Sequence, residues 1–389
     1  MFEQLLPYQN EIATLLSQQL TGGVFPHSVL IAGRRFSGRL TLAMEVARVL
    51  SCTREALSSC QCASCKRFDL YGMSNVVYIG NRDHGTRIAA ALTVARESAN
   101  ERGRRFLIRI VRLMLLQYHS ALIVARDSKN SGIFESAAVV SEELNALESA
   151  PEEKIGAYTD RLEVALKALD AHYRRSSPLS INQVRSLQEW IMQTGLDGQV
   201  RCIILEGVEE STESARNSLL KLLEEPPEHT YILVLSEHPA RLLPTILSRL
   251  QRYQVRKLTE AAETQLLMDQ FGMAGSSLEE FMLRKAHIPC NELKEIARQY
   301  AESTLKREVL SREALDRIIS ELDEPVRLEY FLNQFQQHVR DHFIAGRCAR
   351  RTAAGLMNIA SESAHLAFVF NQNRKLLVES LHYRLQEVV

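Results

Sequence analysis

Two glycines, Gly33 and Gly38, lie in a loop between a short apolar run and a helical pattern. Their spacing is that of a phosphate-binding loop, in which backbone amides wrap the phosphates, a lysine neutralises them and a hydroxyl holds magnesium. In this chain Arg39 replaces the lysine and Leu40 replaces the hydroxyl. Thr41 is a poor substitute, because one step along a helix rotates a side chain by about 100°. The loop therefore has the form of a phosphate-binding loop without its reactive side chains.

The second half of such a nucleotide site is an acidic pair at the end of a neighbouring strand. The apolar run 203–205 ends in Glu206, where the magnesium-holding acid belongs, and Gly207 follows where a general base would stand. Phosphoryl transfer needs positioning and charge neutralisation together, so we expect no ATP hydrolysis by this chain. We also do not expect it to bind ATP, although residual nucleotide binding through Arg39 and the loop amides is an alternative. Taken alone, the glycine loop is equally typical of an ordinary strand-to-helix turn.

Four cysteines within fourteen residues form a second candidate site, with seven, one and two residues between them: Cys52, Cys60, Cys62 and Cys65. In a reducing compartment such a cluster is typical of a closed, tetrahedral zinc site. We expect a structural role, because no spare position or nearby acid indicates metal catalysis. A three-cysteine site and unligated thiols are the alternatives.

A group of arginines occupies helical spacings further along the chain: Arg102, Arg104, Arg105, Arg109 and Arg112. Such a group could form a patch that binds DNA phosphates or a partner. It could equally form a solvated face paired with the acidic stretch 142–153. The sequence does not decide between these two interpretations.

The elements that must position these residues follow from the apolar pattern. We predict buried strands over 28–32, 76–79, 200–205 and 231–235, and helices over 9–20, from 40, over 181–192 (capped by Ser180), 214–223 and 242–250. Alternating strands and helices predict a parallel sheet with helices on both faces. Residues 85–175 and the chain beyond 258 have a helical pattern without strands.

Composition narrows the possible locations and partners. The 389-residue chain has 47 basic and 47 acidic side chains, so it has no overall electrostatic attraction to nucleic acid. It contains no apolar run of the length that spans a membrane. The first residues are partly acidic and lack the pattern of a signal peptide. We therefore expect a cytoplasmic protein with no membrane contact.

Three segments carry a more specific pattern, in the order Phe-Pro-His-Ser-Val-Leu (25–30), Asn-Ser-Leu-Leu-Lys-Leu-Leu-Glu-Glu-Pro-Pro (217–227) and Leu-Leu-Pro-Thr-Ile-Leu-Ser-Arg (242–249). Together with the cysteine cluster, they resemble the clamp-loader subunits of bacterial DNA polymerase III, which are AAA+ proteins. The resemblance covers about residues 1–80 and 178–255. Two departures are Leu250, where the family has a cysteine, and Gln61, which alone separates two cysteines that the family spaces by two residues.

Within this family, motor subunits of the gamma/tau type keep an intact phosphate loop, and delta subunits lack the Glu-Glu-Pro-Pro and Ser-Arg pair. This chain combines a phosphate loop that lacks its lysine and hydroxyl with the Glu-Glu-Pro-Pro and Ser-Arg motifs, and in this it is similar to the delta-prime branch. The resemblance implies an AAA+ module over 1–255, with a zinc module (52–65) and a largely helical insertion (about 85–177). It further implies a helical lid over 256–305 and an all-α collar over 306–389 that joins a five-subunit ring.

The resemblance also implies a function. The chain would be a non-hydrolysing stator that supplies Arg249 as an arginine finger to ATP on a neighbouring subunit, while Glu224 and Glu225 position the helix before it. Its partners would be gamma/tau and delta subunits, a sliding clamp and primed DNA. One alternative is an active ATPase of the same family that uses Arg39 and Glu206. A second is a zinc-dependent, DNA-binding repair accessory protein built on an inactive ATPase module.

Overall fold

The computed structural model describes residues 1–3, 5–80, 82–122, 131–173, 179–193, 199–273, 275, 277–308, 310–369 and 373–388. The chain divides into two compact units, Met1–Ala286 and His287–Val389. Among the helices of these described residues, none has the length and apolarity needed to cross a membrane.

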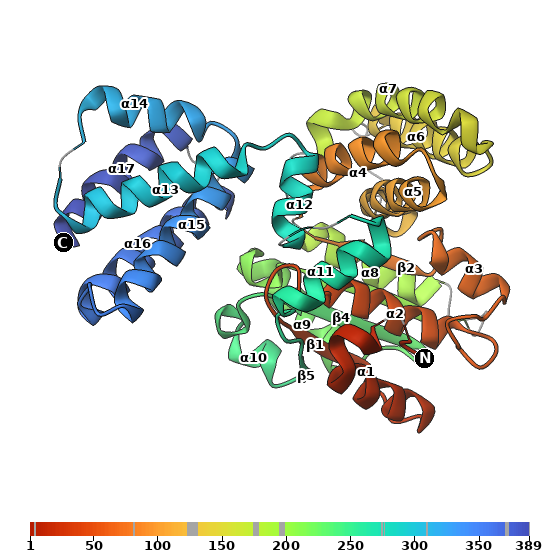
Figure 1. Ribbon diagram of the computed structural model, residues 1–389. Coiled ribbons are helices and arrows are strands. Elements are labelled where there is room, and N and C mark those ends of the chain that lie inside the picture. The colour runs from red at the N-terminus through yellow and green to blue at the C-terminus, as the bar shows by residue number, and fades with distance from the viewer. Residues whose placement is uncertain are drawn as a thin grey trace. The chain divides into compact units, whose positions relative to one another are not determined.

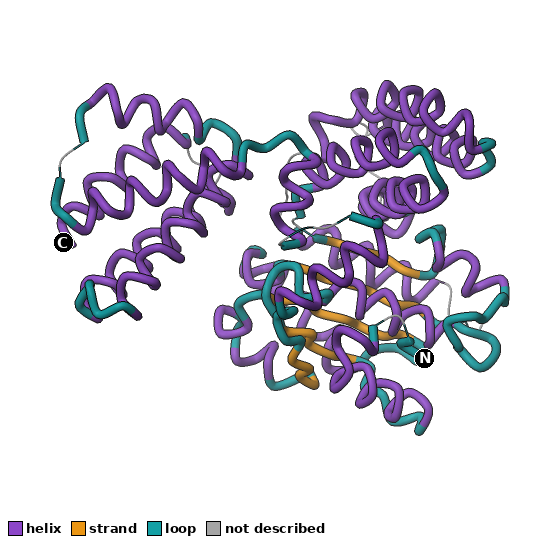
Figure 2. Tube along the Cα trace, in the orientation of Figure 1, coloured by secondary structure: helices purple, strands orange, loops and turns teal. Residues whose placement is uncertain are grey.

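The first unit is built around one parallel sheet. Within the described residues five strands form it, in the order β2-β3-β4-β1-β5 (Figures 1 and 2). Their bounds are β1 Ser28–Ala32, β2 Val76–Ile79, β3 Arg201–Glu206, β4 Thr230–Ser236 and β5 Gln251–Gln254. Every pair of neighbouring strands runs parallel. All residues of β1 and β2 are buried, as expected for a parallel sheet covered on both faces.

Helices cover both faces of this sheet. Val29 and Ile31 of β1 belong to one core with α1 (Leu6–Thr21), α2 (Arg39–Ser51) and α3 (Ala63–Asp69). The intervening Leu30 and Ala32 belong to the opposite core, with α8 (Ile181–Gln193), α9 (Glu213–Glu224) and α10 (Pro244–Leu247). This alternation confirms the predicted α/β module with helices on both faces.

Between β2 and β3 the chain forms a layer of helices with a core of its own. These helices are α4 (His84–Ser98), α5 (Glu101–Leu115), α6 (Ser131–Glu148) and α7 (Ile155–Tyr173). Apolar side chains of all of them, such as Ile88, Leu107, Val140 and Leu162, are fully or almost fully buried together. These four helices therefore form a folded helical body.

After β5 the regular elements of the described residues are all helices. The helices α11 (Glu260–Phe271) and α12 (Leu278–Lys285) complete the first unit. The second unit contains α13 (Cys290–Leu305), α14 (Arg312–Glu321), α15 (Pro325–Ile344), α16 (Arg350–Val369) and α17 (Arg374–Val388). The boundary between the two units lies at residues 286–287, between the boundaries predicted at 255 and 305. The division into module, lid and collar stays a prediction.

One predicted element is wrong in extent. The helix predicted over 242–250 is only the four-residue α10, which begins at Pro244 and is followed by the strand β5. Tyr253 is the one buried residue of β5, and the other three are exposed. Because β5 is an edge strand of mainly polar residues, it lacks the apolar pattern that indicates a strand.

Candidate functional site

The glycine loop lies between β1 and α2, as predicted. A Cβ atom at Gly33 would lie 2.8 Å from both the Ser37 hydroxyl and the Val255 carbonyl oxygen, so the position requires glycine. Gly38 has a φ of 90° and forms the N-cap of α2. The Gln9 amide donates hydrogen bonds to the carbonyls of Ser37, at 3.0 Å, and Arg256, at 2.7 Å. The loop is therefore held between α1 and the segment after β5.

Arg39 turns from the start of α2 toward the carboxyl ends of β3 and β4. The residue is only 4 % exposed. Its Nη2 lies 2.6 Å from Glu237 Oε1 and 3.6 Å from Glu206 Oε1. Its buried Nη1 has no hydrogen-bond partner among the described residues. The structure thus brings Arg39 and Glu206 close together, and their role as the two halves of one nucleotide site stays a prediction.

Glu206 is held by a residue that the sequence analysis missed. The Arg82 guanidinium bonds both carboxylate oxygens, with Nε on Oε2 and Nη2 at 2.8 Å from Oε1. The Tyr78 hydroxyl donates a further hydrogen bond to Oε2 at 2.8 Å. Burial alone would raise the pKa of Glu206, but the positive charges of Arg82 and Arg39 lower this pKa to about 2. The carboxylate is therefore ionised and already paired.

Positive charge also gathers around Arg87, which lies close to both Arg82 and Arg35. The guanidinium groups of Arg35 and Arg87 lie 5.3 Å and 5.6 Å from the centre of the Phe36 ring. Burial, together with the charges of Arg82 and Arg35, lowers the pKa of Arg87 to about 9. Buried His84 has no hydrogen-bond partner for either ring nitrogen among the described residues. Burial and the neighbouring arginines lower the pKa of His84 to about 3, so its ring is neutral.

Arg249 lies at the surface between α10 and β5, with 30 % of its side chain exposed. Its Nε donates to Glu224 Oε1 at 2.7 Å, and its Nη1 donates to the Thr245 carbonyl at 2.6 Å. Glu224 is the last residue of α9. A largely exposed ion pair of this kind contributes about 0–1 kcal/mol, and the guanidinium is held in addition by its bond to the Thr245 carbonyl.

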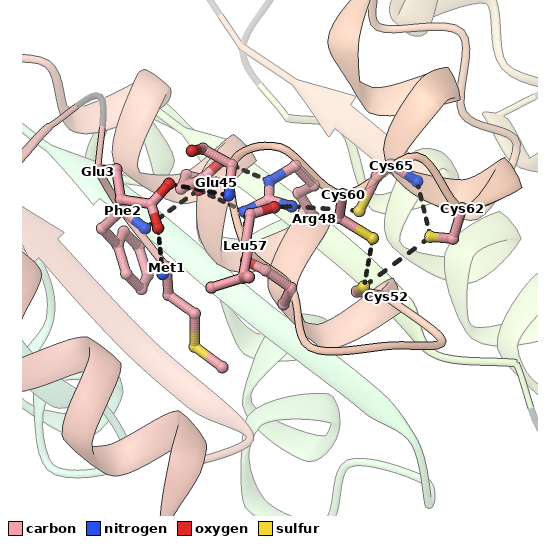
Figure 3. A network of polar contacts seen from close by, with 12 residues as sticks. Met1, Phe2, Glu3, Glu45, Arg48, Cys52, Leu57, Cys60, Cys62 and Cys65 are labelled. Carbon is pink, nitrogen blue, oxygen red and sulfur yellow. Dashed lines mark hydrogen bonds and ion pairs between the residues drawn. The ribbon is translucent and has the colours of Figure 1, made fainter.

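The cysteine cluster forms a compact group of sulfur atoms at the ends of α2 and α3 (Figure 3). The four Sγ atoms all lie within 4.8 Å of one another. The Sγ of Cys52 lies 3.7 Å from that of Cys60 and 3.8 Å from that of Cys62. Zinc bound tetrahedrally at about 2.3 Å from each sulfur requires sulfur atoms about 3.8 Å apart. The cluster therefore fits a four-thiolate zinc site, and such a site leaves no open position for catalysis.

Local backbone groups favour an anionic sulfur in this cluster. Cys62 is the N-cap of α3, and its Sγ accepts the backbone N–H of Cys65 at 3.4 Å. Burial would raise the pKa of Cys62, but the N–H groups of Cys65 and Thr53 lower it to about 5. The single residue between Cys60 and Cys62 does not prevent the four sulfur atoms from converging.

The arginine group on α5 is mostly engaged inside the first unit. Asp69, at the end of α3, pairs with both Arg105 and Arg109. Arg104 pairs with Glu101, and Arg112 pairs with Glu148 and Asn145. Arg102 is exposed. These contacts favour a paired face over a patch for DNA phosphates, although only Arg112 forms its ion pair within the predicted acidic stretch 142–153.

Comparisons with known proteins agree in family. A family model described as DNA polymerase III, delta subunit, matches residues 8–115 and 116–259. The DNA polymerase III subunit delta' of Bacillus subtilis is 38 % identical over 103 residues, which cover 26 % of this chain and 31 % of that protein. The corresponding subunit of Pseudomonas aeruginosa is 44 % identical over 72 residues, 18 % of this chain and 22 % of that protein.

One further relative and one solved structure were also found. A DNA polymerase III subunit gamma/tau of Mycobacterium bovis is 32 % identical over 78 residues, 20 % of this chain and 14 % of that protein. In each of these relatives the matched part spans less than a third of the relative's length. A solved gamma subunit-related protein of Thermotoga maritima is 14 % identical with a TM-score of 0.37, covering 96 % of this chain and 98 % of that one.

Proposed function

This chain belongs to the DNA polymerase III clamp-loader family, and from this premise we propose that it is a non-hydrolysing, delta-prime-like stator subunit. The observation that carries the proposal is the pairing of Glu206 with Arg82, which engages both oxygens of the acid that would hold magnesium. Arg39 and Leu40 stand where the lysine and the hydroxyl of a working loop belong. The chain would therefore shape the ring while neighbouring subunits hydrolyse ATP.

The proposed contribution of this chain to catalysis is Arg249. An arginine finger stabilises the charge of the transition state for phosphoryl transfer and is worth about 10³–10⁵ in rate in the best-studied cases. A planar, permanently charged guanidinium suits this task better than an ammonium group. Arg249 is partly exposed, and its ion pair with Glu224 is weak because it faces solvent. The side chain is therefore available to a neighbouring subunit.

The deciding experiment uses a loader reconstituted with gamma/tau-type and delta-type subunits, a sliding clamp and primed DNA. We expect Arg249→Ala to assemble normally and to lower stimulated ATP turnover at least about tenfold. Arg252→Ala is the matched control, because Arg252 is an exposed arginine three residues away whose side chain bonds Gln254. Unchanged turnover in Arg249→Ala would refute the finger, and a chain that never joins the complex would refute the clamp-loader role.

The two alternative functions are less well supported. An active ATPase would need Glu206 to bind magnesium, yet Arg82 and Tyr78 engage this carboxylate. Turnover by the isolated chain that is lost in Glu206→Gln would nevertheless establish it. A DNA-binding role through α5 is disfavoured, because most of its arginines have acidic partners within the chain.

The four cysteines carry a separate part of the proposal, a structural Zn²⁺ ion. The distances between their sulfur atoms, all within 4.8 Å of one another, support tetrahedral binding of the ion. When bound, the ion would join the end of α2 to the start of α3 without taking part in chemistry. Elemental analysis of the purified chain should find about one zinc per molecule, and none after all four cysteines are replaced by serine. As a replication subunit, the protein would work in the cytoplasm.

A further inference from the structure

The guanidinium of Arg48, on α2, contacts the cysteine cluster, and all of its N–H groups have hydrogen-bond acceptors. The residue is buried. Its Nε and Nη2 donate to the two oxygens of Glu45 at 2.8 Å and 2.7 Å. Nη2 also donates to the Ala56 carbonyl at 2.9 Å. Nη1 donates to the Leu57 carbonyl at 3.2 Å and to Cys65 Sγ at 3.1 Å. All five N–H donors of a guanidinium therefore have acceptors.

Two of these acceptors lie in the loop that joins Cys52 to Cys60. Ala56 has a φ of 54°, a left-handed conformation that is unfavourable for a residue with a side chain. The hydrogen bonds from Arg48 to two successive carbonyls fix this conformation from the inner side. On the outer side, Glu3 Oε2 accepts the backbone N–H of Ser58 at 3.0 Å. The path of this loop sets where Cys60 lies relative to the other three sulfur atoms.

A further acceptor, besides these two carbonyls and the Glu45 carboxylate, is the sulfur atom of Cys65. Four thiolates and one Zn²⁺ ion sum to a charge of −2, and this charge would lie where two of the cysteines are buried. A guanidinium that donates to one of the sulfur atoms offsets part of it. Figure 3 shows Arg48 between Glu45 and the cysteines, so the same side chain joins the metal site to the helix that begins at the glycine loop.

We propose that Arg48 is the positioning residue of the four-cysteine site, which pre-forms the loop 53–59 and compensates the charge of the bound thiolates. The inference rests on the zinc site proposed above. Groups that hydrogen-bond metal ligands tune the site, and their loss typically weakens metal affinity about 10–100-fold. The rival role is an ordinary ion pair with Glu45 within α2, for which a lysine would also serve.

Zinc release from the purified full-length chain to a chromogenic chelator separates these roles. We expect Arg48→Gln to weaken zinc affinity about 10–100-fold relative to wild type. Arg48→Lys should also be weakened, because an ammonium group has three donors and cannot bond two carbonyls, a carboxylate and a sulfur atom together. The matched control is Arg67→Gln, since Arg67 is exposed, lies two residues from Cys65 and forms no side-chain hydrogen bond to a cysteine among the described residues.

The outcomes distinguish the inference from the zinc proposal. If the wild-type chain binds no zinc, both the proposed zinc site and the positioning role of Arg48 are wrong. A wild-type chain that holds zinc, with Arg48→Gln releasing it at the wild-type affinity, overturns only the role of Arg48. Wild-type affinity in Arg48→Lys means that charge alone suffices and also overturns the positioning role. If Arg48→Gln does not fold, Glu45→Gln decides, because Glu45 orients the guanidinium through two hydrogen bonds. Unweakened zinc binding in that variant would count against the inference.

Discussion

Arg82 forms a two-pronged ion pair with Glu206, in which Nη2 lies 2.8 Å from Oε1 and Nε bonds Oε2. Glu206 ends β3, and Arg82 follows the neighbouring parallel strand β2. The carboxyl ends of adjacent parallel strands meet at one edge of a sheet, so the two side chains face each other there. The guanidinium supplies positive charge at the acid where a nucleotide site would need magnesium.

This pairing predicts that repairing the glycine loop alone does not create an ATP site. We expect the double variant Arg39→Lys, Leu40→Thr to bind a fluorescent ATP analogue no better than wild type in the presence of magnesium. Adding Arg82→Ala should improve magnesium-dependent binding at least about tenfold, since it frees the Glu206 carboxylate. Equal binding by the double and triple variants would mean that Arg82 does not block the site.

A second prediction concerns the partner of Arg249. Because the Arg249–Glu224 pair is exposed, Glu224→Gln should change the free energy of unfolding by less than about 1 kcal/mol. In the reconstituted loader it should leave stimulated ATP turnover unchanged or higher, since the finger is no longer held within its own chain. Denaturant titration and the ATPase assay test the two statements. A fall in turnover like that of Arg249→Ala would give Glu224 a direct part in catalysis.

Much of the fold could be predicted because its central strands are continuous apolar runs. The strands Ser28–Ala32 and Val76–Ile79 were predicted with the bounds that the structure has. The helix over 181–192 was predicted from its apolar pattern with Ser180 as its cap, and Ser180 and Gln183 do exchange hydrogen bonds as a capping box. These elements carry their signal in adjacent residues, so no knowledge of distant contacts was needed.

The site could be predicted only in part, because some of its members meet through the fold alone. The cysteines are neighbours in sequence and share a recognisable spacing. Arg82, by contrast, carries no motif, and its role follows from the adjacency of β2 and β3. Arg48 has the pattern of an ordinary helical ion pair, although it also bonds Cys65. Strand β5 was missed because edge strands need no apolar alternation.

The packing of α11 and α12 on the inserted helices gives a third prediction. Phe271 of α11 makes an edge contact with Phe106 of α5 and stacks on Phe281 of α12, with ring centres 4.8 Å apart in both cases. Phe281 is buried, so Phe281→Ala should destabilise the first unit by about 3–5 kcal/mol.

Hydrogen exchange of Phe281→Ala should show which helices lose stability. We expect faster exchange in α11 and α12 and also in α4, which packs on α12 and pairs with it through Lys285 and Glu97. Phe343→Ala, at a phenylalanine 42 % exposed in the second unit, is the control and should have a much smaller effect. Faster exchange confined to α12 would show that the inserted helices do not support this part of the chain.

Buried His84 predicts a pH dependence of stability. Its pKa lies at about 3 in the folded chain, against an ordinary value of 6.5, because burial and the charges of Arg87 and Arg82 oppose protonation. The unfolded chain therefore takes up the proton first as the pH falls. The resulting stability is fully present above pH 6.5 and is lost progressively as the pH falls from 6.5 toward about 3.

Replacing His84 by leucine should remove this component. Neither ring nitrogen has a hydrogen-bond partner among the described residues, so the substitution forfeits no such bond. At about pH 5.5, one unit below the ordinary pKa, this component should have lowered the free energy of unfolding of wild type by about 1.4 kcal/mol. The free energy of unfolding of His84→Leu should not show this decrease. Urea unfolding of both chains at pH 7.5 and pH 5.5 measures the difference, and other titrating groups cancel because they are common to both. Parallel pH profiles would mean that His84 is solvated or charged in the folded chain.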